Sequence, residues 1–194
     1  MDLLSSLGRT LGFSFAAGIN LYATVAILGL ASRFGWVALP EQYRVFDNDW
    51  IIGIALVLYI VEFVADKIPW VDSVWDTIHT VIRPIGGAAI AVATLGHASP
   101  AMETVVALLG GALATSTHLS KTGTRVLANA SPEPFSNWIL SLGEDGFVIA
   151  LSVLALTHPA AAAIVVLVCV AAIVVFLSWV VRAVGKRLRR PSAA

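Results

Sequence analysis

Long uncharged, apolar stretches alternate with short charged segments along this chain. The longest stretches without Asp, Glu, Lys or Arg are residues 10–32, 84–102, 104–120 and 146–181. A membrane-spanning helix needs about 20 consecutive apolar residues, so each of the first three predicts one crossing. The last is far too long for one crossing. We divide it at Pro159, because proline cannot continue the helical hydrogen-bond ladder.

Two further segments approach the length of a crossing but carry acidic residues. Residues 50–65 include Glu62 near their end, and residues 135–157 include Glu144 and Asp145 near their middle. Accepting both predicts an all-α membrane helix bundle that forms one domain over residues 1–194. Its six predicted spans lie at about 11–32, 50–65, 84–99, 102–120, 135–157 and 160–181, followed by a basic tail at 182–194.

The basic residues favour this topology, because cytoplasmic loops of membrane proteins are enriched in Lys and Arg. With six spans, the side that holds both termini receives Arg9, Lys67, Arg83, Lys121, Arg125, Arg182, Lys186, Arg187, Arg189 and Arg190. The other side receives only Arg33 and Arg44. We therefore predict a multi-pass protein with both termini in the cytoplasm.

The composition excludes most other classes of protein. Hydrophobic residues make up 58% of the chain and charged residues 12%, and the mean hydropathy is +0.88. A soluble domain is about one quarter charged. A net charge of zero argues against a nucleic-acid partner. Because the common hydrolase, P-loop and dinucleotide motifs are missing from the sequence, we predict neither an enzyme nor a bound cofactor.

A polar stripe marks the segment 69–83. At helical spacing, Asp72, Asp76, His79 and Arg83 share one face. One interpretation is an interfacial helix that lies flat with this stripe toward water. The other is a re-entrant or buried helix whose stripe lines a polar cavity and relays protons or holds a cation.

Two further polar groups fall inside predicted spans. Glu144 and Asp145 would lie deep in the membrane, where a charge costs several kcal/mol and normally faces a cavity or a cation. Alternatively, the span begins near Glu144. Asn20 and Tyr22 fall at the middle of the first span, where they either form a packing hydrogen bond or face the same polar centre as Asp145.

The segments 66–83 and 121–134 resemble each other. Each has a lysine at or next to its first residue, Lys67 or Lys121, and each contains proline. This similarity is compatible with an old duplication of a hairpin, and equally with two ordinary loops. The second segment, with His118 before it and Arg125 within it, is either an anion-binding loop or an ordinary basic loop.

Three strings of residues carry a resemblance to a known family. They are SFAAGINLYATVAILGL (14–30), EFVADKIPWVDSVWDTIHTVIRPIGGA (62–88) and THLSKTGTRVLANASPEPFSNW (117–138). Together they resemble domain-of-unknown-function family 4126, over roughly residues 10–160. The resemblance implies a small polytopic protein of the bacterial inner membrane and supplies no substrate. It also implies polar family positions at Asn20, Glu62, Asp66, Lys67, Asp72, Asp76, His79, Arg83, Lys121, Arg125, Glu133, Asn137 and Asp145.

Our leading hypothesis is a small cation- or proton-coupled transporter or channel in the lipid bilayer, acting on an unidentified ion or solute. Glu144 and Asp145 with Asn20 would form the mid-membrane site, and Gly143 and Gly146 would form a flexible helix break. The stripe at Asp72, Asp76 and His79 would form the cytoplasmic entrance, with Arg83 as counter-charge.

Two alternatives stay open. One is a lipid flippase or scramblase that holds headgroups with Lys67, Arg83, Lys121 and Arg125. The other is a structural membrane module without transport. The sequence leaves open whether a metal ion binds and whether the chain forms a homo-oligomer.

Overall fold

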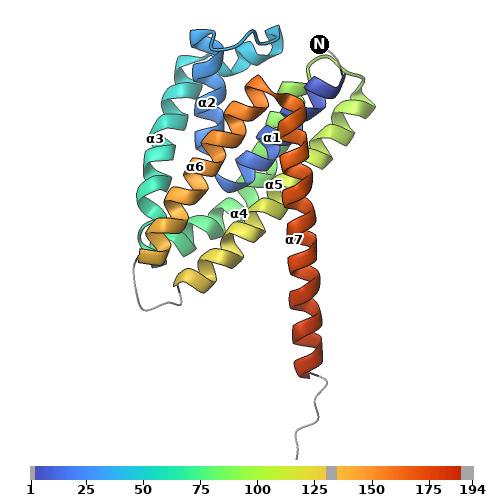
Figure 1. The fold of residues 1–194 in the computed structure, drawn as a ribbon. Helices are drawn as coiled ribbons and strands as arrows, with labels where there is room; N and C mark the ends of the chain where they lie inside the picture. The colour runs from blue at the N-terminus through green and yellow to red at the C-terminus, as the bar shows by residue number, and fades with distance from the viewer. Residues whose placement is uncertain (1–2, 130–134, 189–194) are drawn as a thin grey trace, which may run out of the picture.

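The computed structural model describes residues 3–129 and 135–188, whose regular elements are all helices (Figure 1). They are α1 (Leu3–Ile19), α2 (Leu21–Phe34), the short 3-10 helix η1 (Glu41–Phe46), α3 (Asp49–Ala65), α4 (Pro69–Leu95), α5 (Pro100–Asn129), α6 (Phe135–Thr157) and α7 (Pro159–Leu188). Glu133 and the end of the basic tail, residues 189–194, lie outside the described residues. The all-helical class predicted from the sequence is confirmed.

Three of these helices are long and apolar enough to cross a membrane. They are Pro69–Leu95, Phe135–Thr157 and Pro159–Trp179 within the described residues. The protein is therefore a membrane protein by the length and composition of its helices. Proline stands at the first position of α4, α5 and α7, where its missing N–H is not needed.

The predicted first span, 11–32, is not one helix. The helix is interrupted at Asn20, whose extended backbone (φ −144°, ψ 99°) separates α1 from α2. Figure 1 shows that α2 turns back toward the end of the bundle at which α1 begins. Hydropathy alone could not show this break, because both halves are equally apolar and the polar interruption is a single residue.

The segment 69–83 is not a separate helix. It forms the first half of α4, which continues through Pro84 to Leu95 and replaces the predicted span 84–99. Proline is tolerated in buried membrane helices because neighbouring groups compensate for the lost hydrogen bond. The predicted loop after Lys121 is also helical as far as Asn129, at the end of α5.

The later elements follow the predictions more closely. Helix α6 has the predicted bounds, and α7 begins at Pro159, where the long apolar stretch was divided. However, α6 runs without interruption through Gly143 and Gly146, so the predicted helix break at these glycines is wrong. The helix break lies at Asn20, between α1 and α2, instead.

Small residues bring α4 and α5 into close contact. A side-chain carbon added at Gly87 would collide with Ala114 and lie 3.0 Å from the Gly110 carbonyl oxygen. One added at Gly110 would lie 2.8 Å from the Gly87 carbonyl oxygen. Small residues one turn apart permit this kind of backbone approach in membrane helices. Helix α1 packs across both, and Ser14 donates a hydrogen bond to the Gly87 carbonyl.

The bundle has an apolar half and a polar half. Phe13, Leu28, Tyr43 and Val148 belong to an apolar core beside η1. The buried charged residues gather instead around the lower ends of α3 and α6, as drawn in Figure 1, next to the break at Asn20. The start of α1 and the described end of α7 lie at opposite ends of the bundle (Figure 1).

Candidate functional site

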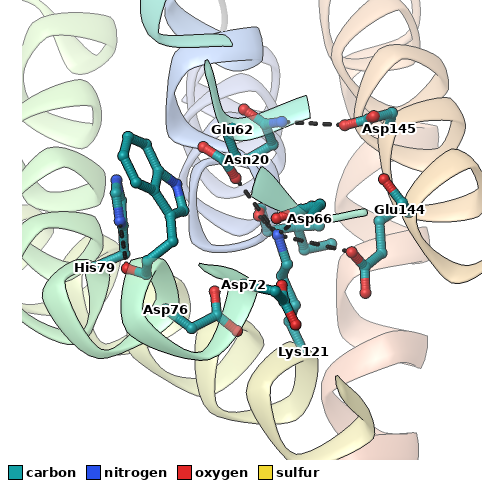
Figure 2. Close-up of polar contacts among 12 residues, drawn as sticks. Asn20, Glu62, Asp66, Asp72, Asp76, His79, Lys121, Glu144 and Asp145 are labelled. Carbon is teal, nitrogen blue, oxygen red and sulfur yellow. Dashed lines mark hydrogen bonds and ion pairs between the residues drawn. The ribbon is translucent and has the colours of Figure 1, made fainter. Parts of the chain in front are cut away.

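Ionisable and amide side chains from five helices meet in one buried cluster, which we call the charge network (Figure 2). Its members are Asn20, Tyr22, Glu62, Asp66, Asp72, Asp76, His79, Arg83, His118, Lys121, Arg125, Asn137, Glu144 and Asp145. They come from α2 and its N-cap, from the end of α3 with the residue that follows it, and from α4, α5 and α6. The members lie far apart in the sequence, so the network exists only in the folded bundle.

Arg83 occupies one side of the charge network and is completely buried. Its Nη2 donates to Glu62 Oε1 at 2.7 Å, and its Nη1 lies 3.4 Å from Asp76 Oδ1. Nη1 also donates to His118 Nδ1 at 2.6 Å, so this ring nitrogen is the acceptor and carries no proton. The stripe on α4 therefore points into the protein, and the interpretation as a flat interfacial helix is wrong.

Lys121 and Arg125 occupy the other side, one helical turn apart on α5. Lys121 Nζ donates to Asp66 Oδ2 at 2.9 Å and to Glu62 Oε1 at 3.4 Å. Arg125 Nη2 donates to Asp66 Oδ2 at 3.0 Å and to Glu144 Oε2 at 2.6 Å. Lys121 thus joins Glu62 to Asp66, and Arg125 joins Asp66 to Glu144 on α6. The positive charge of each side chain is compensated by these carboxylates.

Asn137 completes the attachment of α6. Its side-chain oxygen accepts from Arg125 Nη1 at 2.7 Å, while its amide donates to the Asp66 carbonyl at 3.0 Å. Asp72 lies 4.0 Å from Arg125 at the edge of this group. The lower half of α6 is therefore attached to α5 and the α3–α4 connection through polar contacts.

The break at Asn20 faces the network directly. The Asn20 side-chain oxygen caps α2 by accepting from the Ala23 N–H at 2.9 Å, and its amide donates to Asp145 Oδ1 at 3.0 Å. At the other side of the break, carbonyl groups of the last turn of α1 accept from cations. Arg83 Nη1 lies 3.4 Å from the Gly18 oxygen, and Lys121 Nζ lies 3.4 Å from the Ile19 oxygen.

This arrangement matches the polarity of the two half-helices. The C-terminal end of a helix carries partial negative charge and favours cations, whereas the N-terminal end favours anions. The end of α1 meets Arg83 and Lys121, and the start of α2 meets Asp145 through Asn20. The broken helix is therefore stabilised by the network, and it also contributes to the electrostatics of the site.

Tyr22 and His79 form a neutral branch of the network. His79 Nδ1 lies 2.7 Å from the Trp75 carbonyl oxygen, which can only accept, so Nδ1 carries the proton. His79 Nε2, 2.9 Å from the Tyr22 hydroxyl, then accepts the tyrosine proton in the neutral ring. The Trp75 ring lies against His79 with centroids 4.6 Å apart.

Lys67 stands at the edge of the network, in the connection between α3 and α4. Its Nζ donates to the Phe63 carbonyl at 2.8 Å and lies 3.3 Å from Ser141 Oγ on α6. It also lies 3.0 Å from the centre of the Phe63 ring, within the range of a cation–π contact. Partial burial lowers the pKa of the Lys67 amine, although nearby Asp145 and Asp66 oppose this shift.

Carboxylates outnumber cations in the charge network. Within residues 3–129 and 135–188, the six acids Glu62, Asp66, Asp72, Asp76, Glu144 and Asp145 face Arg83, Lys121, Arg125 and, at the edge, Lys67. Glu62 Oε2, Asp66 Oδ1 and Asp145 Oδ2 are buried oxygens with no hydrogen-bond partner. A buried, unpaired carboxylate oxygen is costly unless a proton or a cation compensates it.

The residues singled out from the sequence come together. The residues predicted to bind the ion or headgroup, or to act as charge partners, all lie in the network or, for Lys67, at its edge, and the expected contact between Asn20 and Asp145 is present. His118, Thr122 and Ser141 were not among them, although Thr122 donates to Asp76 at 3.0 Å. Only His118 had a signal in the sequence, its helical spacing from Lys121 and Arg125, and this was hidden because residues 121–134 were predicted to form a loop.

The arrangement can exchange protons among buried acids and hydroxyl or imidazole groups. Across residues 3–129 and 135–188, no three His, Cys, Asp or Glu side chains are grouped in a way that could hold a metal ion. The groups available for this exchange are carboxylates, two histidines and their hydrogen-bond partners.

The comparisons with known proteins identify a family. A family model described as domain of unknown function DUF4126 matches residues 7–179, which is most of the chain. Neither a curated protein nor a solved structure matches it. The chain therefore belongs to the DUF4126 family.

Proposed function

We propose that this protein is a small membrane transporter or channel that couples solute movement to protons held by the charge network. The observation that carries the proposal is the surplus of buried carboxylates at a broken helix. Ionisable groups within membrane helices typically mark ion pathways and proton relays. Discontinuous helices whose ends point at the bound species are the usual construction of transporter sites.

Asp145 is the proposed proton-binding group. It lies at the break, one of its oxygens accepts from Asn20, and the other has no partner. Every other orphaned carboxylate oxygen named above belongs to a residue that also contacts a cation. Asp145 therefore has the greatest need of a proton, and its protonation would weaken no ion pair given above.

The proposed topology differs from the six crossings predicted from the sequence. That prediction treats residues 11–32 as one crossing, and the break at Asn20 removes this premise. We propose that α1 and α2 enter and leave the membrane from one side and that α3 to α7 each cross it. The basic residues after the apolar part of α7 favour a cytoplasmic position for the C-terminal end, in a bacterial inner membrane.

The two alternatives receive less support. Arg83, Lys121 and Arg125 already pair with carboxylates and have side chains at most 2% exposed, so a lipid headgroup would have to displace these partners. A purely structural module would not need more acids than bases in its interior. We propose no enzymatic activity.

A flux assay tests the proposal. Proteoliposomes containing a pH-sensitive dye receive an imposed pH gradient with potassium and valinomycin for charge compensation. We expect the protein to dissipate the gradient faster than empty liposomes and Asp145→Asn to abolish this activity. Asp49→Asn, at a side chain 88% exposed, is the matched control and should behave like the original chain.

Three results would contradict the proposal. Unchanged flux in Asp145→Asn would remove this residue from the pathway. A folded protein with no flux above empty liposomes would favour the structural module. Redistribution of a fluorescent lipid that depends on Arg83 or Arg125 and not on Asp145 would favour the lipid flippase.

A further inference from the structure

A cavity reaches the charge network between α5 and α6. Its volume is about 240 Å³, and its polar lining includes Thr117, Lys121, Thr124 and Glu144. Phe15 on α1 and Ile173 on α7 belong to its apolar wall. At roughly 30 Å³ per water molecule, the cavity has room for about eight waters or for one compact organic molecule.

The lining carries one base and one acid, and the acid, Glu144, is the more exposed of the two. Lys121 Nζ has three donor hydrogens, and its contacts with Asp66, Glu62 and the Ile19 carbonyl account for all three. Its side chain is 2% exposed, whereas that of Glu144 is 16% exposed. Glu144 is therefore the charged group of the lining that is most accessible to a molecule in the cavity.

The hydroxyl groups of the wall add acceptors rather than donors. Thr117 donates to backbone oxygens, among them the Phe15 carbonyl at 3.1 Å. Thr124 donates to the Ser120 carbonyl at 2.8 Å. With their hydrogens used in this way, the lone pairs of both hydroxyl oxygens remain for a donor in the cavity.

We propose that this cavity binds a small organic cation, with a protonated amine directed at Glu144 and a compact apolar body against Phe15 and Ile173. This inference rests on the proposed function, because it names the class of the transported solute. Asp145 follows Glu144 directly, so a cation at Glu144 and a proton at Asp145 repel each other. Binding of the amine would thus favour proton release from Asp145.

Three probes of similar size and different charge test the ligand class. They are 2-phenylethylamine, 2-phenylethanol and 3-phenylpropanoate, titrated onto the full chain in nanodiscs of zwitterionic lipid while the thermal unfolding midpoint is recorded. We expect a saturable increase with the amine alone. An equal increase with the alcohol or the carboxylate would overturn the proposal.

Two variants test the place of binding. Ile173→Trp fills the cavity from α7 without altering any charge, and it should abolish the response to the amine. Val174→Trp is the matched control, because Val174 is 56% exposed and the cavity lining does not include it. A full response in Ile173→Trp would overturn the proposal.

Glu144→Gln tests the charge. It should weaken amine binding by about tenfold or more, the equivalent of one hydrogen bond to a charged group. Glu144 also pairs with Arg125, so where this variant does not fold, the Ile173→Trp comparison decides the matter. Failure of amine binding together with intact proton flux through Asp145 would reject only the ligand class, whereas loss of flux dependence on Asp145 would reject the proposed function.

Discussion

Asn20 combines two structural tasks in one amide side chain. Its oxygen caps the first turn of α2, and its nitrogen holds the carboxylate of Asp145. It also has the extended backbone that separates two helices. A single buried amide thus joins the helix break to the candidate proton site. Its replacement should therefore lower the free energy of unfolding more than the replacement of an ordinary N-cap residue does.

Comparison of Asn20→Ala with Asn48→Ala tests this expectation. Both residues are N-caps, but Asn48 is exposed and accepts only from the N–H groups of Trp50 and Ile51. Loss of a cap costs about 1 kcal/mol, and an unpaired buried acceptor adds about 1–3 kcal/mol. Asn20→Ala should therefore lower the free energy of unfolding in mixed micelles by the larger amount; equal losses would contradict the dual role.

The individual residues of the site could largely be found from the sequence, because polar side chains are conspicuous in apolar segments. Their partners could not. The pairing of Arg83 with Glu62, and of Lys121 with Asp66, depends on how α3, α4 and α5 are arranged in space. Spacing along one helix places residues on a face, but it does not say which face of another helix they meet.

At the scale of single elements, the contact between α4 and α5 is the most extensive in the bundle. It depends on small residues, chiefly Gly87 and Gly110, whose backbones approach each other closely. The same helices carry Arg83 and Lys121 into the network. Close packing therefore fixes the distance between the charged side chains of α4 and those of α5.

Gly87→Ala should destabilise the protein even though alanine favours helices. Overpacking at such a contact costs about 1–3 kcal/mol, more than the gain of about 1 kcal/mol in helix propensity. Gly53→Ala on α3 is the matched control, since a carbon added there meets nothing within 4 Å. It should be neutral or stabilising. Thermal unfolding of both variants measures the difference, and a stable Gly87→Ala protein would refute the importance of the contact.

The elements that were predicted wrongly share a physical cause. The predicted topology treats charges as markers of loops, but Arg83, Lys121 and Arg125 lie buried within α4 and α5. They consequently say nothing about the side of the membrane, and the positive-inside count loses three of its ten residues. Where no basic residue interrupted the apolar stretch, the bounds of α6 and the start of α7 agreed with the sequence.

At the scale of the whole molecule, the proposed topology has a direct test. Single cysteines replace Leu4, Arg44 or Arg182, all exposed, in a Cys169→Ala background. With α1 and α2 re-entrant, the first two positions lie on one side of the membrane and Arg182 on the other. A membrane-impermeant maleimide should label the two groups from opposite sides. Labelling of Leu4→Cys and Arg182→Cys from the same side would restore the six-crossing topology.

The ion pairs of α5 also bear on how the chain enters the membrane during synthesis. Helix α5 is not among the three helices that qualify by length and composition. A charged residue at the centre of a crossing disfavours insertion by about 2.5–3.5 kcal/mol, and α5 carries both Lys121 and Arg125. Their partners Glu62 and Asp66 precede them in the chain and so leave the ribosome first. Integration of α5 into the bilayer should therefore depend on α3 and the residue that follows it, because their carboxylates neutralise the cations of α5 as it inserts.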